Sequence, residues 1–197
     1  MTKKILLALT ALGTVSILFG CQTTYYLPLI VDEKSGQYPA SRQVEPGGIL
    51  VFKTGQDPRD FPIIILSTKS NYHPTKFAFQ TRSALSQSGF ANVYTWEEFR
   101  KLSADRGMAI DYEVLNTEAI RKFSATYSPV LIVNASFNLL GNSRCNSTIN
   151  VTEGRTTTSL LEVDYSAYVW NSWDSEGIYP VFNELRKWFS ESKKGRI

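Results

Sequence analysis

The chain has 197 residues, and its 21 Lys and Arg side chains nearly balance 18 Asp and Glu, for a net charge of +3. Such a balance provides no electrostatic footprint for nucleic acid, so we expect no nucleic-acid partner. The aromatic content of 13% argues against a disordered chain, and the length suits one domain with a substantial hydrophobic core.

The first twenty residues have the layout of a secretory signal peptide. Lys3 and Lys4 precede an uncharged apolar run over residues 5–19, which leads to Gly20 and Cys21. A helix needs about 20 residues to cross the hydrocarbon core of a bilayer, so this run of 15 residues disfavours a permanent span. We therefore expect residues 1–20 to be removed during export.

The tetrapeptide at this boundary, Leu18-Phe19-Gly20-Cys21, resembles the bacterial lipobox. The resemblance implies that Cys21 is lipidated and becomes the first residue of the mature chain. Acylation of its thiol and amino groups would supply the two or more chains that stable anchoring requires. By resemblance to bacterial sorting rules, Gln22 implies the outer membrane, with the domain facing the periplasm or, alternatively, the cell surface. The competing interpretation is an ordinary signal peptide followed by a coincidental cysteine.

Residues 22–48 are predicted to form a tether, because several Pro and Gly residues interrupt any helical or strand period. The apolar residues at 25–27 and 29–31 are unusual for a linker, and we expect them to dock on the domain or to rest at the lipid surface. The predicted organisation is a lipoprotein signal peptide over 1–20, the lipidated cysteine and tether over 21–48, and a single periplasmic α/β domain over 49–197.

The domain is predicted to begin with a strand at 49–53, followed by a β-α-β unit. Residues 62–67 contain consecutive large aliphatic side chains, which are typical of a strand buried on both faces. A helix follows from Pro74 to Gly89, because proline suits the first helical position and glycine the left-handed exit. A strand at 90–94 completes the unit. The buried stripe of the helix is expected to contain Phe77, Thr81, Ala84, Leu85 and Ser88.

Two further helices are predicted before the apolar period changes. Thr95 and Glu98 have the spacing of a capping box, so a helix should run over residues 95–104. Another helix should begin near Asn116 or Thr117, where a polar side chain precedes an amphipathic run.

From Pro129 onward, apolar and polar residues alternate. This pattern predicts three antiparallel strands that share one buried face and one solvent-exposed face. A tight turn at Gly141-Asn142 joins the first two strands. Cys145 falls in an inward row and would lack a partner if Cys21 is lipidated, so we expect a buried free thiol. The inward rows are Leu131, Val133, Ala135, Phe137 and Leu139, then Cys145, Ser147, Ile149 and Val151, then Leu161, Val163, Tyr165, Ala167 and Val169.

A closing helix is expected over residues 178–191, where Phe182, Leu185, Trp188 and Phe189 have helical spacing. The predicted fold class is therefore α/β. Its mixed sheet has a β-α-β start, further helices, a three-strand antiparallel meander and a closing helix.

Three runs of apolar spacing carry a family resemblance over roughly residues 60–190. They are Ala84-Leu85 through Ser88-Gly89-Phe90 to Val93, then Glu118-Ala119-Ile120 through Tyr127 to Val130-Leu131-Ile132-Val133, and then the meander to Trp170. Together they resemble the amino-terminal domain of TolB, a domain type that also occurs in the curli-secretion lipoprotein and in a lipoprotein activator of penicillin-binding proteins. The resemblance implies binding to other envelope proteins and no catalytic set, and it transfers no functional residue one by one.

The residues themselves also provide few signs of catalysis. His73 is the only histidine, which rules out multi-histidine metal sites. The sequence contains no glycine-rich phosphate loop and no nucleophile elbow. We therefore expect no catalytic residue, no metal and no cofactor.

Aromatic residues near the end of the last strand are the candidate binding residues. Tyr168, Trp170 and Trp173 lie among polar residues, where exposed aromatic rings would serve as binding anchors. The two tryptophans could instead pack over the sheet edge or against the closing helix. Glu162 and Asp164 share the outward face at i and i+2, where they could act as paired carboxylates, bind calcium or form a solvated strand face.

The combined interpretation is a membrane-anchored, non-enzymatic accessory in the assembly or activation of an envelope complex, with an unidentified envelope protein as its partner. One alternative is a ring-forming subunit of a secretion or surface-appendage apparatus, a homo-oligomer with contacts at the sheet edges. Another alternative is a glycan-binding module or weak hydrolase that uses Trp170, Trp173 and the face of Glu162 and Asp164.

Overall fold

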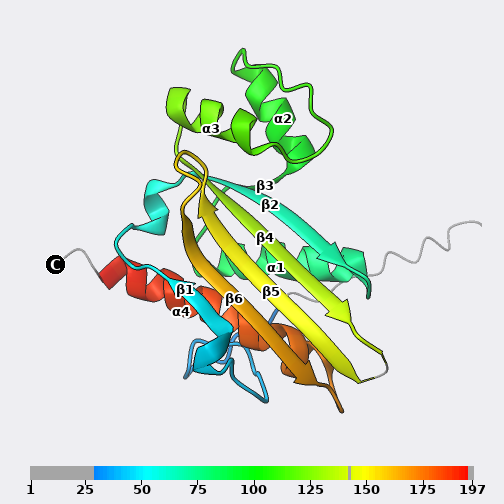
Figure 1. The fold of residues 1–197 in the computed structure, drawn as a ribbon. Coiled ribbons are helices and arrows are strands. Elements are labelled where there is room, and N and C mark those ends of the chain that lie inside the picture. The colour runs from blue at the N-terminus through cyan, green and yellow to red at the C-terminus, as the bar shows by residue number, and fades with distance from the viewer. Residues whose placement is uncertain (1–28, 142, 195–197) are drawn as a thin grey trace, which may run out of the picture.

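The computed structural model describes residues 29–141 and 143–194, so the predicted signal peptide and Cys21 lie outside the described residues. The predicted α/β class is confirmed: a single mixed sheet has the strand order β1-β6-β5-β4-β2-β3 (Figure 1). No helix of the described ranges is long and apolar enough to cross a membrane. The elements are β1 (Ile49–Phe52), β2 (Ile63–Ser70), α1 (Pro74–Ser88), β3 (Val93–Thr95), α2 (Trp96–Asp105), α3 (Thr117–Thr126), β4 (Val130–Leu139), β5 (Arg144–Glu153), β6 (Ser159–Tyr168) and α4 (Tyr179–Lys194), with short turns η1 (Pro46–Gly48), η2 (Pro58–Asp60) and η3 (Asp174–Ile178).

The predicted β-α-β unit is present, with β2 parallel to both β3 and β4. Helix α1 begins at Pro74 and ends before Gly89, whose φ of 105° places it in the left-handed region that glycine adopts without steric cost. All five predicted stripe residues are buried, together with Gln80. The strand expected at 90–94 begins later, at Val93, because the preceding Phe90 turns into the core and packs edge-on against Phe189 with ring centroids 4.8 Å apart.

Helices α2 and α3 begin directly after the predicted capping residues, Thr95 and Asn116. The Thr95 hydroxyl accepts a hydrogen bond from the Glu98 N–H, and the Glu98 carboxylate accepts one from the Thr95 N–H, which completes the capping box. The Asn116 side chain accepts from the Ala119 N–H at the start of α3. The two helices bury the first halves of β2 and β4 in a small second core that contains Ile63, Ile65, Phe99, Ile110, Ile120, Phe123, Val130 and Ile132.

The meander has the predicted alternation, and its register is given by the cross-strand pairs. Leu139 lies opposite Cys145, Ala135 opposite Ile149, and Ile149 in turn opposite Val163. The three predicted inward rows are buried except for Leu139, which is half-buried, so the side chains between them face the opposite side. The same pleat therefore gives β5, β6 and the second half of β4 one buried and one solvated face, whereas the first half of β4 is buried on both faces.

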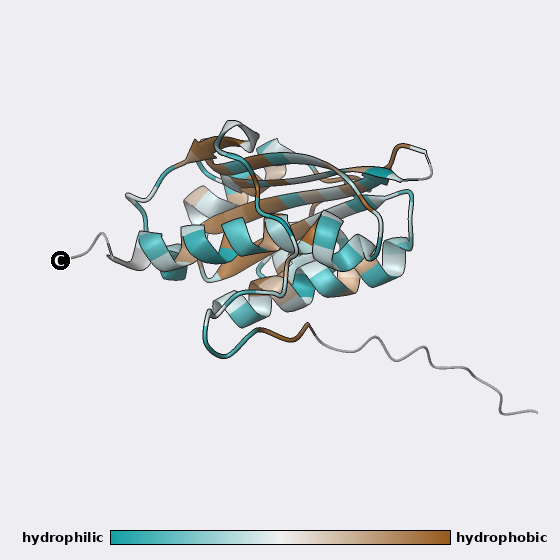
Figure 2. Cartoon of the chain, turned by 90° about the horizontal axis from the view of Figure 1, so that it is seen from below, coloured by the Kyte–Doolittle hydropathy of each residue, from teal (hydrophilic) through white to brown (hydrophobic). Residues whose placement is uncertain are grey.

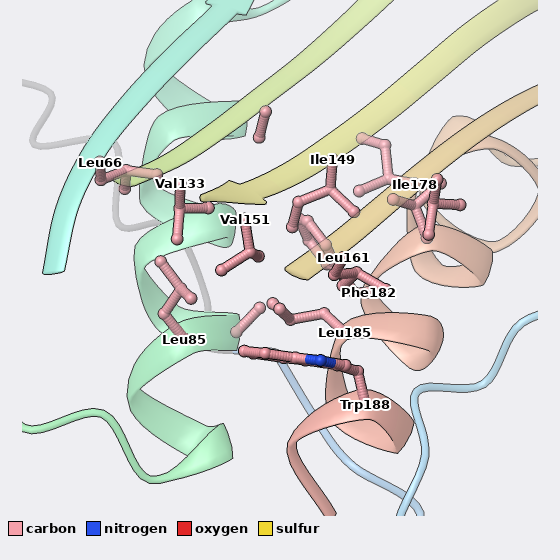
Figure 3. Close-up of a cluster of buried hydrophobic side chains, with 14 of the residues drawn as sticks. Leu66, Leu85, Val133, Ile149, Val151, Leu161, Ile178, Phe182, Leu185 and Trp188 are labelled. Carbon is pink, nitrogen blue, oxygen red and sulfur yellow. The ribbon is translucent and has the colours of Figure 1, made fainter. Parts of the chain in front are cut away.

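Helices α1 and α4 cover the buried face of the sheet. Figure 3 shows Leu85 of α1 and Leu185 and Trp188 of α4 gathered beneath Val151 and Leu161. The Trp188 indole is 1% exposed and donates its N–H to the Lys53 carbonyl oxygen at 2.8 Å, so its one polar atom is satisfied inside the core. The closing helix is longer than expected at its carboxyl end, and the π-helical turn η3 precedes it.

Residues 29–48, here called the strap, pack on the outer surface of the helix layer over their first part and reach β6 at Gly48. Leu29, Tyr38 and Val44 are buried in the main core cluster, and Val31 packs against it. For the described part of the predicted tether, this is the docked arrangement that the apolar residues suggested. Figure 2 shows the strap beneath the two long helices, on the side away from the sheet. The chain then passes around the sheet edge and pairs as β1 with β6.

Cys145 tests the strand register directly. Its side chain is fully buried, and burial raises the pKa of the thiol above its ordinary value, which further suppresses the reactive thiolate. In the folded protein we expect Cys145 to react with maleimide roughly a hundredfold or more slowly than after unfolding. The exposed variant Ser166→Cys, made in a Cys145→Ala background, should react equally fast in both states. Equal rates for Cys145 would show that the register is shifted by one residue.

Candidate functional site

Helices α1 and α4 leave one side of β4, β5 and β6 in contact with solvent, and we call it the open face. It lies toward the viewer in Figure 1, opposite α1 and α4. Its side chains are amides, hydroxyls and two carboxylates arranged in cross-strand rows. They are Asn134, Ser136, Asn138, Asn146, Thr148, Asn150, Thr152, Glu162, Asp164 and Ser166.

Several of these side chains hydrogen-bond to one another. The hydroxyls of Ser136 and Thr148 lie 2.7 Å apart, and the Asn146 amide donates to the Asp164 carboxylate at 2.7 Å. The predicted pair is therefore placed as expected on one face, with Glu162 half-buried and Asp164 exposed and held by an amide. Within the two described ranges, no group of three or more His, Cys, Asp or Glu side chains could hold a metal ion.

Large exposed side chains gather where the three strands end, and we call this group the end patch: Leu140, Arg144, Tyr168 and Trp170. Arg144 lies directly opposite Tyr168, and the Leu140 N–H donates to the Arg144 carbonyl oxygen at 2.8 Å, so the group spans all three strands. Trp170 is 71% exposed and Tyr168 54%. Their rings are nearly parallel, with centroids 6.4 Å apart and an interplanar angle of 20°.

Trp173 lies away from the end patch, on the buried side of the sheet. It is half-buried and packs against Phe137 and Tyr72, with ring centroids 6.4 Å and 5.6 Å away. The structure thus separates the two tryptophans that the sequence placed together. Trp173 has the packing role that was left open for it, because the chain turns into η3 and places this ring against Phe137 of β4. Trp170, in contrast, continues the outward row of β6.

A buried carboxylate holds the backbone of the exposed tryptophan. Glu176 is 4% exposed, and its two oxygens accept hydrogen bonds from the N–H groups of Trp170 at 2.7 Å and Asn171 at 3.2 Å. These bonds, the Trp170 N–H first, hold the pKa of the Glu176 carboxyl below its ordinary value. Sequence reasoning missed Glu176, because an acidic residue in a loop of polar residues has no periodic signal.

The segment beneath the patch is fixed at further points. The Ser147 hydroxyl donates to the Gly177 carbonyl oxygen at 2.6 Å, and the Tyr165 hydroxyl donates to the Glu176 carbonyl oxygen at 2.9 Å. A Cβ on Gly177 would lie 3.0 Å from both the Cys145 sulfur and the Phe137 ring, so a larger residue here would push against these buried side chains, and glycine favours the close approach of η3 to the sheet. An aromatic ring on such a rigid base loses little conformational entropy on binding, which favours a binding role.

The comparisons with known proteins are distant. No family model matches the chain, and no curated protein matches it. The solved LpoB C-terminal domain from Escherichia coli is 12% identical, with 57% of this chain and 87% of that chain covered and a TM-score of 0.38. Lipoprotein GNA1162 from Neisseria meningitidis is 12% identical, with 68% and 97% covered and a TM-score of 0.36. The PelC dodecamer from Paraburkholderia phytofirmans is 11% identical, with 76% and 96% covered and a TM-score of 0.38.

Replacing Glu176 should loosen the end patch selectively. In Glu176→Gln one of the two N–H groups faces an amide NH₂ instead of an oxygen, so we expect hydrogen-exchange protection of the Trp170 and Asn171 amides to fall roughly tenfold or more. The pKa of the Glu176 carboxyl in the folded protein lies below the ordinary 4.5. The ionised carboxylate therefore stabilises the wild-type loop fully above pH 4.5, and this stabilisation is lost as the pH falls through the lowered pKa. The variant should lack this acid-dependent step.

Glu153→Gln is the matched control for this measurement. Glu153 lies at the other end of β5 and accepts a hydrogen bond from the Thr156 hydroxyl, so its substitution should leave Trp170 protection unchanged. Undiminished protection in Glu176→Gln would show that the carboxylate does not hold the loop.

Proposed function

We propose that the protein is an exported lipoprotein, anchored through acyl chains on Cys21, whose domain binds a protein of the bacterial envelope as a non-enzymatic accessory. The observation that carries the binding role is the end patch, in which a 71%-exposed Trp170 is held by the buried Glu176 carboxylate. The lipobox-like Leu18-Phe19-Gly20-Cys21 supports the anchor. The outer membrane is the proposed location, as Gln22 implies.

The composition of the end patch favours a protein partner. Trp, Tyr and Arg are the residue types that most often dominate protein interfaces, and Trp170, Tyr168 and Arg144 adjoin here. Covering the exposed part of the Trp170 ring system would contribute roughly 3–4 kcal/mol before the costs of association. The complementary surface would offer an apolar pocket to the indole and a carboxylate to Arg144.

A double substitution tests this docking surface. Tyr168→Ala combined with Trp170→Ala should abolish crosslinks from a photoreactive residue at position 166 to the partner in cells. Because both rings are exposed, each change should alter the free energy of unfolding by no more than about 0.5 kcal/mol, so the melting temperature should barely move.

Tyr112→Ala is the matched control. Tyr112 has the same 54% exposure as Tyr168 but lies between α2 and α3, so crosslinking should persist in this variant. A stable Tyr168→Ala/Trp170→Ala protein with normal crosslinks would remove the end patch from consideration.

The anchor has its own test. Cys21→Ala should abolish metabolic labelling with a fatty-acid analogue and leave unprocessed or misplaced protein, because the acylated thiol is lost. Cys145→Ala should keep full labelling, since that cysteine is buried in the folded domain. Unchanged labelling of Cys21→Ala would contradict lipidation at this residue.

A glycan is the second candidate ligand, favoured by the rows of amides and hydroxyls beside the aromatic pair. Asn134 lies opposite Asn150 and Asn138 opposite Asn146, so four amides lie on neighbouring strands. Amides both donate and accept hydrogen bonds, as sugar hydroxyls require. Sedimentation with purified cell wall that depends on these asparagines, with no protein crosslink, would favour this candidate over a protein partner.

A further inference from the structure

We infer that the strap sets the orientation of the domain on its membrane, with the helix layer turned toward the bilayer and the end patch turned away from it. The partner would then be a protein that approaches from the aqueous side, not one seated level with the anchoring bilayer. This inference rests on the proposed anchor at Cys21 and deepens the proposed function by naming the side from which the partner comes.

The strap enters the described structure on the helix side. Leu29 is 5% exposed, and its carbonyl oxygen accepts a hydrogen bond from the Gln87 amide at 2.7 Å, near the end of α1. The next residue, Ile30, is 76% exposed. A large apolar side chain therefore faces solvent beside the point from which the chain leads back to Cys21, where contact with lipid would remove it from water.

Tyr38 holds the strap against α1 and α4 through several contacts. It is 2% exposed, its backbone N–H donates to the Asn183 side chain at 2.8 Å, and the Asn183 amide donates back to its carbonyl oxygen at 3.0 Å. Its hydroxyl donates to Gln87, and the Arg186 guanidinium lies 5.4 Å from its ring centroid. Arg186 also donates to the Gly36 carbonyl oxygen at 2.8 Å. The strap thus belongs to the folded domain from Leu29 onward.

The short distance along the chain to Cys21 limits how the domain can turn. Leu29 follows Cys21 by eight positions in the sequence, and even a fully extended chain of eight residue steps spans at most about 28 Å. The helix layer and the sheet lie between the strap and the open face, and each layer adds roughly 10 Å (Figure 2). The two layers together are roughly 20 Å thick, so bringing the open face to the bilayer would take up most of the roughly 28 Å reach before any path around the domain is added.

Fluorescence quenching measures this orientation. The acylated protein is reconstituted in vesicles of phosphatidylethanolamine and phosphatidylglycerol that contain a headgroup nitroxide lipid, with a fluorescent amino acid introduced by amber suppression at Glu33 or Asn134. Both positions are exposed, on the strap and on the open face respectively. We expect the nitroxide lipid to quench the Glu33 probe several-fold more than the Asn134 probe. Equal or stronger quenching at Asn134 would overturn the inference.

A longer tether is the control. A Gly/Ser insertion of about 20 residues between Pro28 and Leu29 adds roughly 25 Å of reach and should reduce quenching at Glu33 to the level at Asn134. A difference that persists with this insertion would mean that something other than the short connection orients the domain, and would also overturn the inference.

Failure of the anchor is distinguished by flotation. If the protein made in cells does not float with vesicles, the proposed lipidation fails. Coupling the Cys21 thiol of the chain that begins at Cys21 to a maleimide phospholipid then supplies the same attachment point, and the two probes still report the orientation that the strap imposes.

Discussion

Burial of one face of the meander under α1 and α4 is the constraint on which the other features depend. Each large side chain in the inward rows contributes about 1.5–3 kcal/mol when it leaves water, whereas a typical hydrogen bond on the open face contributes about 1 kcal/mol. Because side chains alternate with a period of two, the apolar rows that include Ile149 and Val163 determine which residues face solvent. The open face is thus a consequence of core packing.

The position of the end patch depends on the same burial of the inward rows. Val169 is buried by the same alternation, and the chain then turns beneath the sheet through η3, which brings the Glu176 carboxylate under the Trp170 backbone. A buried charge is costly unless hydrogen bonds compensate it, and the N–H groups of Trp170 and Asn171 do so. The exposed indole therefore stands on a base determined by the core.

The strap gives the domain two unlike sides. By packing Leu29 and Tyr38 on the helix layer, it joins the amino-terminal connection to the side opposite the open face. Its last residues pass around the sheet edge, where Gly48 approaches the Asp164 carbonyl oxygen so closely that a Cβ would lie 2.5 Å away. In the proposed function, attachment and recognition therefore occupy opposite surfaces of one small domain.

The sequence alone determined the features that depend on local spacing: the capping box at Thr95, the glycine exit of α1, and the inward position of Cys145. Periodicity encodes which face of an element is buried but not what covers it. Only the tertiary structure could therefore pair β1 with β6, a strand more than a hundred residues later, and dock the strap on the helices. The separation of Trp170 from Trp173 and the role of Glu176 likewise depend on how η3 folds back against the sheet, which is a matter of packing between distant residues and has no local signature.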